Sequence, residues 1–237
     1  MARKKKAEKN TEVNPSHKAE GPEPAEQERL PVFKVSVRKL VAFSIPDDTT
    51  WSFTTYFQLQ EGSQAHSEIQ GRNKAEGAYQ SEVYLSHLYE TSKCMVEISG
   101  RADGVWELKD ETIIHEIKTT STPLPEIHED FSEAHWAQGK CYAFIYAASK
   151  NLDRITVRLT YFHRPSGQEK SFDRTFTFER LQKFVKSLVH PFAAWALSQA
   201  KWREIRDMSI KALEFPFPAY REGQRLLAYN TYKCIQD

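Results

Sequence analysis

Apolar and polar residues alternate in three parts of the chain in a way that predicts strands. In the first part, Val35 and Val37 alternate with polar neighbours, which indicates a short strand followed by a helix over RKLVAF. In the other two parts, two alternating stretches are joined by a polar turn, which predicts two hairpins. Their strands are expected at 94–109 with 112–119, and at 154–164 with 170–179.

Helical spacing accounts for most of the remaining chain. Between residues 63 and 89 the apolar positions fit one or two helices. A strongly apolar face over 129–149 predicts another helix, and 178–213 predicts a long one with a break or kink at Pro191. The order strand, helix, strand pair, helix, strand pair, helix predicts an α/β fold in which helices flank a sheet.

Charge limits what the chain can bind. Residues 1–30 are charged, contain prolines and carry almost no large apolar side chains, so we expect a disordered tail. Its RKKK run could contact nucleic acid or simply be solvated. The whole chain has 33 basic and 32 acidic residues and a net charge of +1, so any basic surface for nucleic acid must be local.

Apolar runs and cysteines indicate the compartment. No apolar run approaches the roughly 18 residues that span a bilayer, and the N-terminus lacks the apolar stretch of a secretory signal. We therefore expect no membrane partner. Three scattered cysteines, Cys94, Cys141 and Cys234, form no CxxC pair and suit a reducing cytoplasm better than a disulfide framework.

The stretch GRADGVWELKDETIIHEIKTT places two carboxylates and a lysine on the first predicted strand pair. Glu116 and Lys118 are two residues apart and share one face of their strand, whereas Ile117 points into the core. A hard cation such as Mg²⁺ takes oxygen ligands, so Asp103 and Glu116 could bind it, with the carbonyl of Ile117 within reach. Lys118 could then position or deprotonate an attacking water and offset charge on a phosphodiester transition state.

Two helical patterns add further candidates. His66 lies on the expected upstream helix, where its imidazole could be another metal ligand. Gln138 and Tyr142 are four residues apart, so they share one face of the helix that follows the strand pair. That helix is long enough to cross the sheet and to present both side chains near Lys118.

Each of these features also has a purely structural explanation. The alternatives are a surface histidine for His66, a turn for Asp103, an ion pair for Glu116 with Lys118, and helix packing for Gln138 with Tyr142. His115, beside Glu116, is either structural or in contact with a substrate.

Four short motifs in this order resemble the RecB-type branch of the PD-(D/E)xK nuclease superfamily. They read GSQAH, GRAD, EIK and QGKCY, and correspond to a helix with G-x-x-x-H, a strand with G-R-x-D, a strand with acid-x-Lys and a helix with Q-x-x-x-Y. The resemblance covers roughly residues 33–200. It implies a restriction-endonuclease-like core, with a mixed central sheet flanked by helices, and a Mg²⁺- or Mn²⁺-dependent deoxyribonuclease.

The resemblance also implies a role for each motif residue. The implied metal ligands are His66, Asp103, Glu116 and the main-chain carbonyl of Ile117. The implied catalytic residues are Asp103, Glu116, Lys118, Gln138 and Tyr142. The last two would orient the lysine or the DNA strand. Several relatives bind an iron–sulfur cluster through four cysteines, and with three cysteines here we expect no such cluster.

The C-terminal stretch LEFPFPAYREGQRLLAYNTYK resembles the opening motif of XPD/DinG-type helicases, in which an aromatic–proline segment leads to Y-R-x-G-Q. The resemblance implies that Gln224 reads the adenine of ATP, with Tyr220 and Arg221 nearby. No phosphate-binding G-x-x-x-x-G-K-[ST] occurs, so ATP is expected to matter only within a longer helicase. The order of motifs is most similar to bacterial DinG-like helicases that begin with a nuclease domain.

The expected organisation has three parts: a disordered tail at 1–30, a nuclease domain at 31–208 and the start of a helicase domain at 209–237. The expected function is metal-dependent hydrolysis of DNA, single-stranded or branched, in repair or processing. The alternative is a catalytically silent, nuclease-like module that binds DNA and loads or anchors the helicase. A broken ligand set would favour that alternative, and the set in this sequence is intact.

Overall fold

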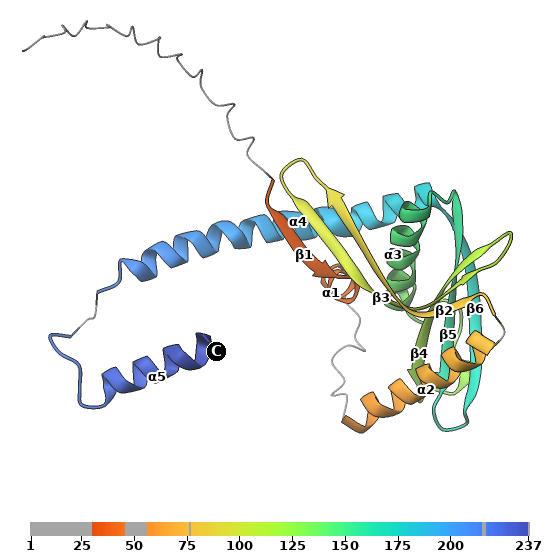
Figure 1. Cartoon of the computed structure of the whole chain (residues 1–237), viewed down its shortest axis with the longest axis horizontal. Helices are drawn as coiled ribbons and strands as arrows, with labels where there is room; N and C mark the ends of the chain where they lie inside the picture. Colours follow the sequence, from red (N-terminus) through yellow and green to blue (C-terminus); the bar gives the residue numbers. More distant parts are fainter. Residues whose placement is uncertain (1–29, 46–55, 76, 215–216, 237) are drawn as a thin grey trace, which may run out of the picture. The chain divides into compact units, whose positions relative to one another are not determined.

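A computed structural model of the chain describes residues 30–45, 56–75, 77–214 and 217–236 (Figure 1). The tail predicted for residues 1–30, with its RKKK run, lies outside this part except for its last residue.

A single mixed sheet contains the six strands of the described chain. The strands are β1 (Val32–Ser36), β2 (Tyr79–Glu90), β3 (Met95–Glu107), β4 (Thr112–Thr120), β5 (Arg154–His163) and β6 (Gln168–Thr177). Their order is β1-β3-β4-β5-β6, and β2 pairs with β3 outside this path. The pairs β1–β3 and β4–β5 are parallel, whereas β2–β3, β3–β4 and β5–β6 are antiparallel. Both predicted hairpins are confirmed.

Helices cover both faces of this sheet (Figure 1). The main core joins one face to α1 (Val37–Ser44), α3 (Glu133–Lys150) and α4 (Phe178–Lys211). On the other face, Ala65 and Ile69 of α2 (Tyr56–Ala75) pack against Ile117 and Phe162. A mixed sheet with helices on both faces confirms the predicted fold class.

Helix α3 lies close against the sheet and carries the fold's central apolar face. Its first turn is capped by Ser132, whose side chain accepts a hydrogen bond from the His135 N–H at 3.3 Å. Gly139 allows the close approach, since a Cβ there would lie 2.5 Å from Cγ1 of Val157 on β5. Cys141 on this helix is buried, and so is Cys94.

Two predictions about local structure were wrong. The helix expected between 63 and 89 ends at Ala75, and Tyr79–Glu90 is strand β2. Its burial alternates strictly from residue to residue, with Tyr79 and Leu85 among the inward positions. The absence of helix breakers favoured a helix, but the two-residue period of buried positions is that of a strand.

Of the break or kink expected at Pro191, the break does not occur, because α4 continues through the proline to Lys211. Buried residues on both sides of the proline, including Val189 and Phe192, pack into the core and hold the helix together. The boundary predicted at 208/209 therefore falls within the last turn of α4.

Helix α5 (Gln224–Gln236) follows in the sequence. None of the helices that the structure describes has the length and hydrophobicity needed to cross a bilayer.

Replacing Gly139 by alanine should destabilise the protein by about 1–3 kcal/mol, because the new methyl group would overlap the branched side chain of Val157. Urea unfolding would measure this loss. Gly71→Ala on α2 is the matched control, since nothing lies within 4 Å of its Cβ position. That change should be neutral or stabilising by about 0.5–1 kcal/mol, and equal effects of the two substitutions would contradict the packing argument.

Candidate active site

The candidate site lies where strands β3 and β4 separate. Their main-chain pairing runs from Glu107 with Thr112 to Gly104 with His115, and the register ends there. At the next residue of β3, Asp103, a side chain replaces the main-chain acceptor. Its Oδ2 accepts a hydrogen bond from the Ile117 N–H at 2.7 Å. The side chain of Asp103 thus satisfies a donor of β4 and remains fixed at the fork between the strands.

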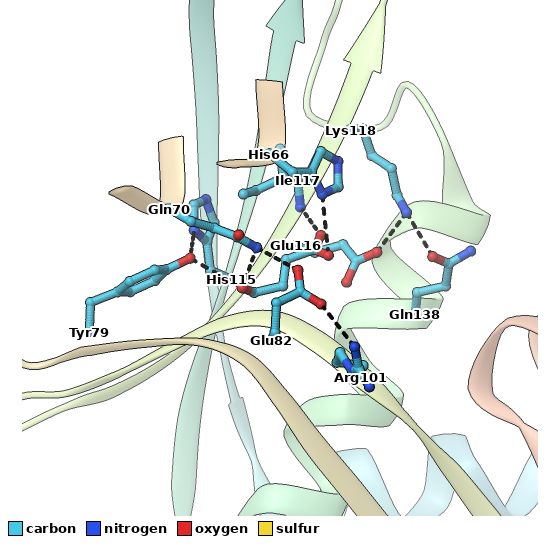
Figure 2. A network of polar contacts seen from close by, with 11 residues as sticks. His66, Gln70, Tyr79, Glu82, Arg101, His115, Glu116, Ile117, Lys118 and Gln138 are labelled. Atoms are coloured by element: carbon cyan, nitrogen blue, oxygen red, sulfur yellow. Dashed lines mark hydrogen bonds and ion pairs between the residues drawn. The ribbon is translucent and has the colours of Figure 1, made fainter. Parts of the chain in front are cut away.

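Lys118 joins strand β4 to helix α3. Its Nζ lies 2.6 Å from Oε1 of Glu116 and 2.7 Å from Oε1 of Gln138, so the ammonium donates to both (Figure 2). Glu116 is 4% exposed. Its second oxygen, Oε2, is buried and has no hydrogen-bond partner in the described structure.

The pKa values of Glu116 and Asp103 are shifted in opposite directions. Burial raises the pKa of Glu116 to about 7; Lys118 opposes this shift and the charge of Asp103 adds to it. Burial also acts to raise the pKa of Asp103, but the hydrogen bond and charge of His66 and the Ile117 N–H outweigh it and hold that pKa below its ordinary value. Asp103 is therefore the more firmly ionised of the pair.

His66 reaches the same carboxylate from the opposite face of the sheet. Its Nδ1 lies 3.5 Å from Oδ1 of Asp103. The imidazole comes from α2, whereas Gln138 comes from α3, so helices on both faces of the sheet contribute side chains to the site (Figure 2).

Tyr142 lies one turn beyond Gln138 on α3 and is buried against β3. A Cβ at Gly100 would be 2.9 Å from the Tyr142 hydroxyl oxygen, so this ring packs directly on the glycine. Burial, together with the charges of Glu116 and Asp103, raises the pKa of Tyr142. The structure thus brings together all the motif residues predicted for the nuclease site, with Gln138 on the lysine and Tyr142 on the strand that carries Asp103.

Three further residues at this site were not predicted from the sequence: Gln70, Tyr79 and Glu82. Nε2 of Gln70 lies 2.9 Å from the main-chain oxygen of Asp103, and the Tyr79 hydroxyl lies 3.4 Å from the same oxygen. Gln70 also donates to Oε1 of Glu82 at 2.8 Å. The spacing of Gln70, four residues after His66 on a helix, was the one available signal.

His115 is a structural residue in this arrangement. Its ring is 1% exposed, with Nδ1 3.1 Å from the Tyr79 hydroxyl and Nε2 2.8 Å from Oγ1 of Thr160. A side chain enclosed in this way is out of reach of a substrate, so of its two predicted explanations the structural one holds.

The donor atoms suit a hard divalent cation. Mg²⁺ needs only one or two carboxylates and completes its shell with water and phosphate. Asp103 and the unpartnered Oε2 of Glu116 supply such oxygens. Among the residues that the structure describes, no three or more His, Cys, Asp or Glu side chains are arranged to hold a metal ion.

The predicted ATP-binding residues lie at the start of α5. Oε1 of Gln224 accepts the Arg221 N–H at 3.0 Å, which links the first residue of the helix to the turn before it. Tyr220 is about half exposed. A role for these three residues in reading adenine stays a prediction.

Comparison with known proteins gives only distant likenesses. The chain matches no protein-family model and no curated protein. Among solved structures, an alkaline exonuclease (LHK-Exo) from Laribacter hongkongensis is similar at 11% identity and a TM-score of 0.47, over 76% of this chain and 95% of that one. The protein SSO0001 is similar at 14% identity and a TM-score of 0.46, over 70% and 78%. Likenesses this weak assign neither a family nor an activity.

The buried ring of His115 predicts a loss of stability in mild acid. Burial lowers its pKa to about 4, whereas in the unfolded chain it titrates near 6.5. The unfolded state therefore gains a proton that the native state does not, so stability is full above about pH 6.5 and falls toward pH 4. In metal-free buffer, urea unfolding should show a loss attributable to this ring on the order of 1–2 kcal/mol between pH 7 and pH 5.

His115→Gln should reduce that loss, and His190→Gln, which changes an exposed ring on α4, should leave it unchanged. Comparing the variants cancels the contributions of the other groups. A loss in His115→Gln as large as that of the wild type would show that another group is responsible.

Proposed function

We propose that this chain is a divalent-metal-dependent nuclease that hydrolyses phosphodiester bonds in DNA. The observation that carries this proposal is the buried carboxylate of Glu116. One of its oxygens is held by Lys118 and the other has no partner. Burying a carboxylate with an unsatisfied oxygen costs free energy, and beside Asp103 this arrangement supports a cation site better than a purely structural ion pair.

In the proposed site, His66, Asp103, Glu116 and the carbonyl of Ile117 hold Mg²⁺ or Mn²⁺. When bound, the cation supplies Lewis-acid stabilisation of charge that develops on the phosphate. Asp103 is preorganised for this task because the Ile117 N–H fixes one of its oxygens.

Lys118 is placed to act on the substrate itself. An ammonium group has three donors, and Glu116 and Gln138 engage its Nζ at 2.6 and 2.7 Å. The remaining donor is available for a phosphate oxygen or for the attacking water. Because its two protein partners fix its direction, the lysine can meet charge that appears in the transition state without reorganising.

Exposure indicates how DNA reaches these groups. Glu116 is enclosed, whereas the side chains of Lys118 and His66 are 17% and 27% exposed. The scissile phosphate would therefore approach at the fork between β3 and β4, where the lysine and the histidine are partly exposed. Since the chain's net charge is only +1, local Lys and Arg side chains would hold the other phosphates, and binding should weaken as salt rises.

The wider setting is proposed on the resemblance of the C-terminal stretch alone. In a longer DinG-like helicase, ATP would be bound near Gln224 by the motor, and the nuclease would act in the cytoplasm on single-stranded or branched DNA during repair or processing. A catalytically silent module that anchors the helicase is the second candidate.

Glu116→Gln should lower DNA cleavage by about 10²–10³-fold or more, because the amide removes the charge that holds both the cation and Lys118. The assay would follow end-labelled single-stranded and duplex DNA with Mn²⁺, Mg²⁺ or EDTA. Glu179→Gln, at an exposed ion pair on α4, is the matched control and should cut like the wild type.

Undiminished metal-dependent cutting by Glu116→Gln would overturn the assignment. If the wild type cuts in no metal, the silent module is favoured, and calorimetry with MnCl₂ would then be expected to show no binding at millimolar concentration.

A further inference from the structure

Gln70 and His66 occupy successive turns of α2 and both meet Asp103. His66 lies beside the carboxylate, with Nδ1 3.5 Å from Oδ1. Gln70 donates to the main-chain oxygen of the same residue at 2.9 Å. Two side chains that are four residues apart on one helix thus contact the carboxylate and the main-chain oxygen of the same aspartate.

The second hydrogen bond of Gln70 goes to a distorted point of the sheet. Strands β2 and β3 pair in one continuous register, except that the pair Glu82 with Asp103 is missing. Glu82 has a φ of 55°, which a glutamate rarely adopts and which costs free energy. Nε2 of Gln70 lies 2.8 Å from Oε1 of Glu82, so its amide bridges the two residues of the missing pair (Figure 2).

Other described contacts also hold α2 at this point, among them a hydrogen bond between the buried Asn73 and Tyr79. Its apolar contact with the sheet consists of Ala65 and Ile69 against Ile117 and Phe162. Its ion pair between Arg72 and Glu169 is partly exposed, and such pairs contribute little. Gln70 is 7% exposed. Of the two buried polar residues described on α2, Gln70 and Asn73, it is the one that contacts Asp103. It therefore helps to set how far along Asp103 the helix lies, and with it the placement of His66.

We infer that Gln70, braced by Glu82, is a positioning residue that holds His66 and Asp103 in the geometry required for cation binding. The inference rests on the proposed function, because it assigns to Gln70 a control over the affinity of that same site. Residues that orient metal ligands without touching the metal commonly alter affinity by about 10–100-fold. Gln70 would act in this way through the main chain of Asp103 and through the helix that carries His66.

Gln70→Met tests the inference, because methionine keeps the length and helix propensity of the side chain but removes both hydrogen bonds. Calorimetric titration with MnCl₂ should show affinity reduced by about 10-fold or more. DNA cleavage should fall at limiting Mn²⁺ and recover at saturating Mn²⁺, which a general loss of structure would not allow. Gln64→Met, at an exposed position of the same helix, should bind and cut like the wild type.

A second pair of variants guards against misfolding of Gln70→Met. Glu82 is about half exposed, so Glu82→Ala should fold. It removes the brace and should weaken Mn²⁺ binding, whereas Glu82→Gln retains an acceptor for Gln70 and should restore it. Two results would overturn the positioning role, provided that the wild type binds Mn²⁺ and cuts DNA. One is that Gln70→Met binds Mn²⁺ as tightly as the wild type, and the other is that both Glu82 variants do. If the wild type neither binds nor cuts, the proposed function itself fails.

Discussion

The hydrogen bond from the Ile117 N–H to the Asp103 carboxylate is the contact on which the candidate site depends. It lies where the β3–β4 ladder ends, and it replaces a main-chain acceptor by a side chain. Strand β4 pairs in parallel with β5 from Ile113 to Thr120, and beyond His115 it has no main-chain register with β3. The hydrogen bond therefore fixes Asp103 beside Glu116 at the point where β4 parts from β3.

The second carboxylate, that of Glu116, is buried at a cost in stability. Enclosing Glu116 and placing Lys118 against it takes two charges from water, and such buried pairs often give no net stabilisation over apolar residues. Gln138 satisfies a further donor of the lysine, yet Oε2 of Glu116 remains without a partner among the described residues. An arrangement that is expensive and incomplete is better explained by chemistry than by stability.

Local patterns predicted the parts of the site that depend on one element at a time. The turn between β3 and β4 and the two-residue spacing of Glu116 and Lys118 follow from strand periodicity, and the shared face of Gln138 and Tyr142 follows from helix periodicity. The contribution of β2 was missed because Tyr79–Glu90 contains no helix breaker. Gln70 and Glu82 could not be predicted, since their contact depends on one unusual φ and on where α2 crosses the sheet.

The two halves of the site are held with different firmness. Gln138 belongs to α3, which is buried along its length and packed closely on β5 through Gly139. His66 belongs to α2, which is attached to the sheet by the small cluster around Ile69, by hydrogen bonds of Gln70 and Asn73, and by the ion pair of Arg72. The placement of Lys118 is therefore built into the core, whereas that of His66 depends on a few replaceable contacts. In the proposed nuclease site, a change in α2 would therefore alter metal affinity without disturbing Lys118.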